Sequence, residues 1–404
     1  MRILFITAEG FDTPNPCNQM AEVMLNDFLN AGHEVHLIQS SKKKIFPLIP
    51  DSLKDRNRFS HETIDRKNID RTNFIKRYLN EVHYTFQSLK RWVKCRNADV
   101  IYVQSNPVSV YTLILLKLFK PKTPIVYSIY DVFPGHAFDI GVIKNKVVYN
   151  ILKILQWPSY KLASAILVLS TDMKRIVERL GAKGSKIHVV PAWYDVNNTT
   201  EIADSDNQFM KKYGINHNKF IVQFAGTIGY VFNYKTIIEL AKRLKEYNDI
   251  ELLMIGDGNV KEQFVKEATE LGLDNIKFYP LQPIKLVPDV YSASDICIIP
   301  LMKGVIGNGV PSKTAILMAC HRVILSSVEQ DSDYAKMFSE KNMGVSVEIE
   351  DYDKLAEAVL YLKNNPKTVK LMSQNAYEYG RMTYSSTRGT KLILDVFHSV
   401  ADKK

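Results

Sequence analysis

The feature that most restricts the fold of this chain is a local pattern that occurs twice: short runs rich in Val, Ile and Leu, separated by stretches with helical periodicity. In the first half it predicts strands at Arg2–Thr7, Glu34–Gln39, Asp99–Gln104, Pro124–Tyr130, Ala165–Leu169 and Ile187–Val190. In the second half it predicts strands at Phe220–Ala225, Ile250–Ile255, Asn275–Phe278, Asp295–Pro300, Arg322–Ser326 and Gly344–Val347. Such alternation is typical of a parallel sheet covered by helices on both faces. The sequence therefore predicts an α/β protein with two doubly wound domains, and ligand sites at the carboxyl ends of the strands.

Apolar side chains spaced three or four residues apart predict the helices between these strands. Gln19–Asn30 and Val108–Phe119 have this spacing, and the second is expected to be a buried helix. The segment Phe74–Arg96 has an apolar helical face made of Phe74, Tyr78, Val82, Phe86, Leu89 and Val93. Ser385–Val400 predicts a final helix without a following strand. The polar stretch Tyr194–Gln208 predicts a linker between the two halves.

Length and composition limit the class of protein. The chain has 404 residues, of which 46% are apolar, so it can form more than one hydrophobic core. No run approaches the roughly eighteen apolar residues of a membrane-spanning helix. The N-terminal run lacks the basic region and cleavage site of a signal peptide. Cys17, Cys95, Cys297 and Cys320 form no close pair typical of a metal or redox motif, so a cytoplasmic protein is expected.

The net charge of +10 is concentrated in the first half of the chain. Residues 1–200 contain 28 Lys+Arg and 17 Asp+Glu, a balance of +11, whereas the remainder contains 25 and 26, a balance of −1. This asymmetry predicts an anionic partner for the first half: nucleic acid, an anionic membrane or a phosphorylated acceptor. A recognised motif that reads nucleic acid is absent, which disfavours the first of these.

Glycines directly follow two predicted strands of the second half. The residues concerned are Gly226, Thr227, Gly229, Gly256 and Gly258. Glycine permits a tight turn and lets backbone N–H groups approach a phosphate closely. A strand-to-helix turn without any ligand needs the same residues, so the sequence leaves both roles open.

The most informative segment is the glycine-rich run Gly304–Lys313, which leads into the apolar helix Thr314–Cys320. A glycine-rich loop at the start of a helix offers free N–H donors and the positive end of the helix dipole to an anion. Lys313 places a cation where helix starts normally favour an acid, which predicts that it meets the negative charge of a ligand. A surface lysine whose stem lies along the helix is the alternative.

Seven short motifs, in order along the chain, resemble those of GT-B glycosyltransferases of family four, in particular the O-antigen and capsule branch that contains the N-acetylfucosamine transferases. They are the early glycine-containing loop, Ala31–Val35, Asp131–Pro134 with Gly141–Asn145, Val190–Trp193, Ala225–Gly229, Gly256–Gly258 and Val310–Thr314. The resemblance extends over nearly the whole chain. It implies a GT-B fold of two facing Rossmann-like domains, residues 1–195 and 205–384, with a last helix, residues 385–404, that crosses back to the first domain.

The resemblance also implies the chemistry. The donor would be a nucleotide sugar, usually a UDP-sugar, and transfer would retain the anomeric configuration without a metal or another cofactor. The implied donor-binding residues are Gly226, Thr227, Gly229, Gly256, Gly258, Pro280, Leu281, Ile284, Gly309, Val310, Pro311, Ser312, Lys313 and Thr314, of which Pro280–Ile284 would lie near the base. The catalytic candidates are Asp131, Asn308 and Lys313, and Lys313 would stabilise charge on the leaving nucleotide.

The chain departs from the family at several positions. The paired glutamates of the family are replaced by Asn308 and Ile316. Asn308 can still hydrogen-bond a sugar hydroxyl, whereas Ile316 cannot bind ribose. His321 stands where the family has glycine. Tyr130 replaces a histidine that contacts the 6-hydroxyl of the donor in relatives, so a 6-deoxy sugar, such as a 6-deoxy N-acetylhexosamine, is expected as the donor.

Loops that follow strands of the first half carry the acceptor candidates. The acceptor-binding candidates are Asn15, Cys17, Asn18 and His136. Asp131 and His136 share one strand-end loop, where a carboxylate and an imidazole can serve acid–base chemistry or bind a sugar. A loop-capping aspartate and an exposed histidine are the alternative roles, and the sequence leaves them open.

A basic and apolar segment suggests contact with a membrane. Lys42–Lys44 precede the proline-broken run Ile45–Pro50, and the predicted helix Phe74–Arg96 carries further cations. Cations beside apolar groups suit an anionic bilayer, to which each contributes about 1 kcal/mol. A packed loop and a solvated helix face are the alternative. A polyprenyl-diphosphate-linked saccharide as acceptor would account for a peripheral protein on the inner face of the cell membrane.

The sequence thus predicts a retaining glycosyltransferase that moves a sugar from a UDP-sugar to a lipid-linked saccharide in cell-surface polysaccharide synthesis, either O-antigen or capsule. UDP-sugar 2-epimerases share the architecture, but their acid-rich Arg-Glu-x-Thr-Glu-Arg-Pro-Glu segment is absent. A non-catalytic protein that binds a sugar nucleotide is a second alternative, because a fold does not guarantee a function.

Overall fold

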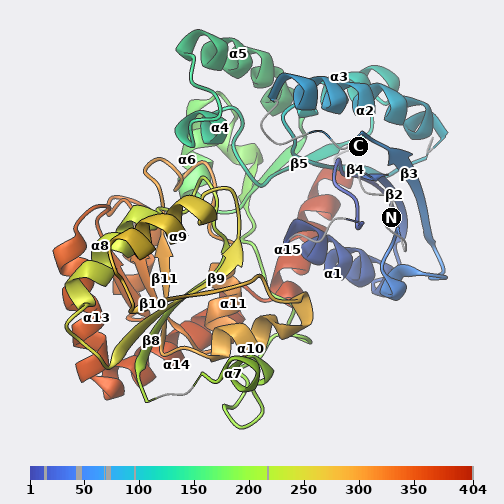
Figure 1. Cartoon of the computed structure of the whole chain (residues 1–404). Coiled ribbons are helices and arrows are strands. Elements are labelled where there is room, and N and C mark those ends of the chain that lie inside the picture. The colour runs from blue at the N-terminus through green and yellow to red at the C-terminus, as the bar shows by residue number, and fades with distance from the viewer. Residues whose placement is uncertain are drawn as a thin grey trace. The chain divides into compact units, whose positions relative to one another are not determined.

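Two parallel sheets, one from each half of the chain, form the framework of the protein (Figure 1). The computed structural model describes residues 1–12, 16–41, 48–67, 69, 74–94, 97–215 and 218–402. The chain divides into two units. Unit 1 comprises Met1–Ala192, Gly307–Val310 and Ser386–Lys404, and unit 2 comprises Trp193–Ile306 and Pro311–Ser385.

The described part of unit 1 contains a seven-stranded parallel sheet with the order β3-β2-β1-β4-β5-β6-β7. Its strands are β1 (Arg2–Ile6), β2 (Glu34–Ser41), β3 (Phe59–Asp65), β4 (Val100–Gln104), β5 (Ile125–Ile129), β6 (Ala165–Val168) and β7 (Ile187–Val189). Six of them confirm the strands predicted for this half. The edge strand β3 was not predicted, because its residues, FSHETID, are mostly polar and lie in a charged segment.

Helices cover both faces of this sheet. They are α1 (Pro16–Asn30), α2 (Phe74–Lys94), α3 (Ser109–Phe119), α4 (Gly135–Asp139), α5 (Lys146–Leu162), α6 (Thr171–Arg179) and α15 (Ser386–Ala401). The helices α2, α3 and α5 lie side by side on one face (Figure 1), and α1 packs against α15 on the other. The chain end thus joins unit 1, where the Phe28 and Phe397 rings lie 5.4 Å apart.

The apolar faces of α2 and α3 differ in part from those predicted. On α2, Phe86 is exposed, and the large side chains that the protein buries are Tyr84 and Trp92. On α3, Leu118 and Phe119 at the C-terminal end are exposed, so this helix is not buried throughout. Helical spacing identified both helices correctly, but it could not tell which side chains meet the sheet.

Unit 2 contains, among its described residues, a six-stranded parallel sheet with the order β10-β9-β8-β11-β12-β13. Its strands are β8 (Phe220–Thr227), β9 (Ile250–Asp257), β10 (Ile276–Tyr279), β11 (Ile296–Pro300), β12 (Val323–Ser327) and β13 (Gly344–Val347), all of them predicted. Its helices are α7 (Gln208–Tyr213), α8 (Tyr234–Leu244), α9 (Lys261–Glu270), α10 (Val287–Ser292), α11 (Lys313–Ala319), α12 (Asp333–Glu340), α13 (Tyr352–Asn364) and α14 (Pro366–Thr383).

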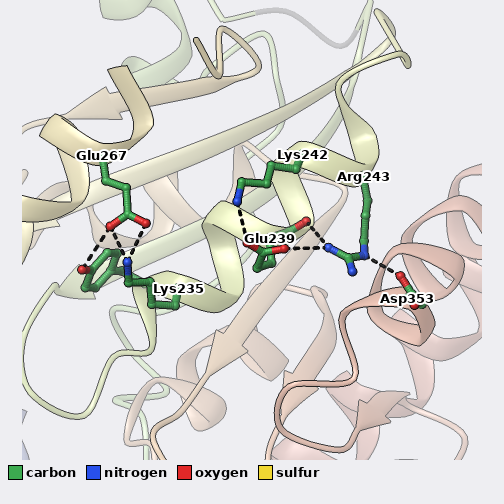
Figure 2. A network of polar contacts seen from close by, with 7 residues as sticks. Lys235, Glu239, Lys242, Arg243, Glu267 and Asp353 are labelled. Atoms are coloured by element: carbon green, nitrogen blue, oxygen red, sulfur yellow. Dashed lines mark hydrogen bonds and ion pairs between the residues drawn. The ribbon is translucent and has the colours of Figure 1, made fainter. Parts of the chain in front are cut away.

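Ion pairs tie the outer surface of α8 to its neighbours (Figure 2). Lys235 binds Glu267 of α9 at 2.6 Å, and Arg243 binds Asp353 of α13 at 2.5 Å. Glu239 accepts hydrogen bonds from Lys242 and Arg243 within α8. Exposed pairs of this kind each contribute only up to about 1 kcal/mol, so the apolar core beneath α8 holds the unit together.

One position outside the core corresponds to a departure found in the sequence. His321, at the family's glycine position, has a φ of 53°, a left-handed conformation that favours glycine, and its ring stacks on Tyr377 at 3.9 Å. Among the residues that the structure describes, no helix combines the length and the apolar composition needed to cross a bilayer.

Candidate functional site

Glycines lie at the carboxyl ends of β8 and β9. The two strands run in parallel with Gly226 opposite Gly256, and these glycines have φ values of 143° and 147°. A Cβ atom on Gly256 would lie 1.9 Å from the carbonyl oxygen of Gly226, and one on Gly258 would lie 2.3 Å from that of Ile228. Gly256 and Gly258 are therefore required by backbone packing alone, whatever they bind.

Gly226 leaves room for a different neighbour, the side chain of Lys313. A Cβ atom at Gly226 would lie 3.2 Å from Lys313 Nζ, and this ammonium group sits 3.4 Å from the centre of the Phe224 ring. Burial lowers the pKa of Lys313 from 10.5 to about 7. Throughout the described ranges, no carboxylate pairs with it. By its exposed surface Lys313 is half-buried, so a ligand can reach it. A cation held there without a counter-charge is costly, so this position favours an anionic ligand.

The residues around Lys313 differ in whether a ligand can reach them. Ser312 precedes α11, is exposed, and makes no capping bond in the described chain. The Thr314 side chain is instead buried, with its hydroxyl 2.8 Å from that of Tyr334. Thr227 is exposed at the end of β8, while Gly229 is buried. Thr227, Ser312 and Lys313 are therefore open to a ligand, and Thr314 faces the interior of unit 2.

The loop after the edge strand β10 presents apolar side chains to solvent. Leu281 and Ile284 are exposed, as is Pro280. Gln282 fixes the loop, because its amide donates to the Tyr213 hydroxyl at 3.0 Å and to the Pro280 carbonyl at 2.7 Å. An exposed apolar surface held in place at the edge of a sheet can pack against a planar base.

Two charged residues at this edge of unit 2, Lys261 and Glu329, were not predicted as site residues. Lys261, the first residue of α9, donates to the Gly256 carbonyl at 2.6 Å. Glu329 follows β12, and its Oε1 accepts the backbone N–H of Gly304 at 2.5 Å. Its Oε2 is buried and has no hydrogen-bond partner among the described residues. An acid three residues beyond the predicted strand Arg322–Ser326 was the signal for Glu329, because ligand sites gather at such ends.

The segment Gly307–Val310 belongs to unit 1, apart from the rest of its glycine-rich loop. The Val132 N–H donates to the Asn308 carbonyl at 2.8 Å. The Asn308 side-chain amide donates to the carboxylate of Asp139 on α4. Val310 packs against the core of unit 1, whereas Pro311 begins the part of the loop that lies in unit 2. Asn308, predicted as catalytic, is thus held against the loop that carries Asp131.

Asp131 and His136 face this segment. His136 Nε2 lies 3.9 Å from Asp131 Oδ1, and a Cβ atom on Gly309 would lie 3.0 Å from the same oxygen. His136 Nδ1 is buried without a partner in the described chain. The Asp131 side chain keeps 61% of its surface exposed, yet the surrounding protein raises its pKa, while His136 opposes that rise. The loop thus places the carboxylate of Asp131 near the imidazole of His136.

The remaining acceptor candidates lie on and before α1. Burial, and to a lesser extent Asp131, raise the pKa of Cys17 to about 12, which keeps this thiol protonated at neutral pH. The Asn18 amide donates to the Gly10 carbonyl at 2.7 Å and is buried, so it holds the preceding loop. Asn15 and Lys42–Lys44 lie outside the described residues. Tyr130 has its hydroxyl 3.4 Å from that of Tyr102.

Comparison with known proteins finds a glycosyltransferase domain family in each half of the chain. Residues 20–198 match the domain family described as Glycosyltransferase Family 4, and residues 205–379 match the one described as Glycosyl transferases group 1. The probable glycosyltransferase WbjE of Pseudomonas aeruginosa is 22% identical over 68% of this chain and 69% of its own. The putative colanic acid biosynthesis glycosyl transferase WcaI of Escherichia coli K12 is 26% identical over 36% of each chain.

Solved structures share the whole fold. Anabaena Alr3699/HepE, crystallised with UDP, has a TM-score of 0.74 at 15% identity and covers 99% of this chain and 100% of its own. The sucrose-phosphate synthase of Thermosynechococcus elongatus has a TM-score of 0.75 at 13% identity and covers 100% of both chains. The chain therefore joins a Glycosyltransferase Family 4 domain to a Glycosyl transferases group 1 domain in the GT-B fold, and it is a glycosyltransferase.

Proposed function

We propose that this enzyme transfers a sugar from a UDP-sugar to a lipid-linked saccharide during the synthesis of a cell-surface polysaccharide, with retention of the anomeric configuration. The observation that carries the donor part is Lys313, an ammonium group without a counter-charge beside the glycine end of β8. The relative WcaI is named for colanic acid biosynthesis, and the neighbour HepE binds UDP, which supports the class of donor and pathway.

Unit 2 would hold the donor. The diphosphate would bind Lys313 and Ser312, next to Thr227, while the uracil would pack on the exposed side chains of Leu281 and Ile284. Glu329 would accept a donor hydroxyl through its unpartnered oxygen, a role for which Ile316 is chemically unsuited. When the bond between the anomeric carbon and the diphosphate breaks, negative charge develops on the departing UDP, and Lys313 would stabilise it.

Unit 1 would supply the acceptor side. Asp131 and His136 lie within 3.9 Å of each other, with Asn308 fixed beside their loop by Asp139. In the proposed reaction the acceptor hydroxyl attacks the anomeric carbon on the face from which UDP leaves, a new C–O bond forms, and the hydroxyl proton is released. Asp131 and His136 would orient that hydroxyl. The reaction is proposed to need no metal, so addition of EDTA should leave its rate unchanged.

The proposed donor sugar is a 6-deoxy N-acetylhexosamine. Its motivation is Tyr130, which stands where relatives have a histidine for the 6-hydroxyl and whose own hydroxyl lies 3.4 Å from that of Tyr102. A panel of UDP-sugars with and without the 6-hydroxyl tests this choice. A single 6-hydroxy donor with a higher kcat/KM than every 6-deoxy donor would refute it.

The transferase assay uses purified protein, the UDP-sugar panel and a short polyprenyl-diphosphate saccharide, with the products weighed by mass spectrometry. An acceptor that gains the mass of one sugar, together with release of UDP, is the expected result. Conversion of the sugar nucleotide to its 2-epimer would instead identify an epimerase. Binding of UDP-sugar without turnover of any acceptor would favour a non-catalytic sugar-nucleotide-binding protein.

A further inference from the structure

The helix α5 of unit 1 has the opposite polarity from an ordinary surface helix. The residues that it buries are Gln156, Ser159 and Tyr160. Its outward face consists instead of exposed apolar side chains: Val147, Val148, Ile151, Ile154, Leu155 and Trp157. Ile154 keeps 73% of its surface exposed. A soluble helix normally presents its polar face to water, so this face is expected to have a partner.

The neighbouring helix extends the same surface. The helix α3 packs along α5 (Figure 1), and its C-terminal residues Leu118 and Phe119 are also exposed, Leu118 to 69%. A groove of about 500 Å³ runs beside α5, lined by Asn150, Lys153, Ile154, Trp157 and Leu180. We call the exposed apolar side chains of α5, together with Leu118 and Phe119, the α5 face.

The two segments that form the α5 face, Val100–Tyr130 and Ile140–Thr171, carry charges of one sign. Exposed lysines border it: Lys122, Lys144, Lys146, Lys153 and Lys161. The sequence has no Asp or Glu between Val100 and Tyr130 or between Ile140 and Thr171. Lys161 Nζ lies 5.2 Å from the centre of the Trp157 ring, so a cation and an aromatic ring meet at the edge of the apolar surface.

We propose that the α5 face docks on the surface of an anionic lipid bilayer. Apolar side chains would enter the region between headgroups and acyl chains, and the lysines would extend to the phosphates, as in interfacial amphipathic helices. The observations favour lipid over a protein partner, because five exposed lysines on segments that contain no acid of their own suit a uniformly negative surface. This placement does not depend on the segment Lys42–Lys44, and it is independent of the donor chemistry, since docking requires no sugar nucleotide.

Trp157 provides a direct reporter. The chain has three tryptophans, of which Trp92 and Trp193 are buried while Trp157 is exposed. Vesicles made of equal parts phosphatidylglycerol and phosphatidylcholine should shift the emission of the full-length protein to the blue and protect it from acrylamide. Pure phosphatidylcholine vesicles should do neither. The variant Trp157→Phe should lose the shift while still sedimenting with the anionic vesicles.

Paired variants separate the contribution of the apolar side chains to vesicle binding from that of the lysines. Ile151→Gln with Ile154→Gln removes apolar area without introducing a helix breaker and should lower vesicle partitioning by tenfold or more, on the order expected for two partly buried isoleucines. Lys146→Gln with Lys153→Gln should lower it about thirtyfold, since each lysine near the surface contributes about 1 kcal/mol. The matched control is Leu371→Gln with Met382→Gln, two exposed apolar residues of α14 in unit 2, which should leave partitioning unchanged.

Folding and donor binding are checked separately by thermal unfolding with and without UDP, which all three pairs should leave as in wild type. Equal vesicle partitioning of the α5 variant and wild type would overturn the proposal. A second result would also overturn it: wild type does not bind anionic vesicles but forms a dimer, and Ile151→Gln with Ile154→Gln dissociates that dimer. The α5 face would then bind a second copy of the chain. If wild type bound anionic vesicles but not UDP, that result would count against the proposed donor site and not against the proposed docking of the α5 face.

Discussion

At the scale of single residues, the proposed donor site depends on the environment of the Lys313 side chain in unit 2. Its ammonium group sits beside Gly226 and over the ring of Phe224, and burial lowers its pKa to about 7. Desolvation therefore destabilises the protonated form of Lys313 in the free protein, and a bound anion would stabilise that form. Gly226 contributes by the absence of a side chain, since a Cβ there would crowd the lysine.

The lowered pKa predicts a pH-dependent affinity. As the pH rises from about 6 to about 8.5, Lys313 loses its proton, and the affinity for a UDP-sugar should fall roughly tenfold, as calorimetry can measure. The variant Lys313→Arg keeps its charge and should show a flat profile. In the free protein the unfolding free energy should rise between about pH 7 and about pH 10.5, because the unfolded chain binds this proton more tightly there. A flat wild-type affinity profile would contradict the role of Lys313.

Glu329 makes a second prediction at this scale. Since its buried Oε2 has no partner in the described chain, Glu329→Gln should leave the melting temperature unchanged or higher, while it raises the KM for the donor five- to twentyfold, about 1–2 kcal/mol. The control Glu262→Gln changes an exposed acid in the first turn of α9 and should alter neither quantity. Lower stability with an unchanged KM would assign Glu329 a structural role only.

At the scale of elements, the last helix shows how a distant segment completes a unit. In α15, Phe397 is fully buried against Phe28, and Thr390 donates to Asp27 of α1 at 2.7 Å. The sequence predicted this helix from its spacing, whereas its attachment to residues 1–195 followed only from the resemblance. Spacing alone does not tell which sheet a helix covers, because any sheet can bury the same apolar face.

The variant Phe397→Ala should therefore lower the unfolding free energy of unit 1 by about 3–5 kcal/mol. The matched variant Phe338→Ala empties a fully buried position of α12 in unit 2 and should lower the stability of that unit instead. Calorimetry with and without UDP distinguishes the two, since UDP should shift only the transition of unit 2. If Phe397→Ala and Phe338→Ala both affected the UDP-sensitive transition alone, α15 would not stabilise unit 1.

At the scale of the whole molecule, the sequence predicted most of the fold and part of the site. Strands rich in Val and Ile were recognisable because both faces of a parallel sheet are buried. The polar edge strand β3 was not, since its side chains face water. The α5 face was also missed, because an apolar helical stripe looks the same in a sequence whether it turns toward the core or toward a partner.

The candidate site was predictable where backbone geometry dictates the residue, as at Gly226 and Gly256, whose φ values suit glycine. It was not predictable where contacts come from distant segments. Asn308 sits against Asp139, and Glu329 accepts the N–H of Gly304, and neither pairing leaves a local pattern. Thr314 illustrates the converse, because its place in a recognisable motif did not indicate that its hydroxyl meets Tyr334.

The measurement that tests the central claim most directly is thermal unfolding of wild type and Lys313→Ala with a panel of UDP-sugars. The matched control is Lys235→Ala, a lysine of unit 2 that pairs with Glu267 on the surface (Figure 2). A UDP-sugar should raise the melting temperature of wild type and Lys235→Ala but not of Lys313→Ala, which would locate the diphosphate at Lys313. Equal stabilisation of all three proteins, or of none, would contradict this account of the donor site.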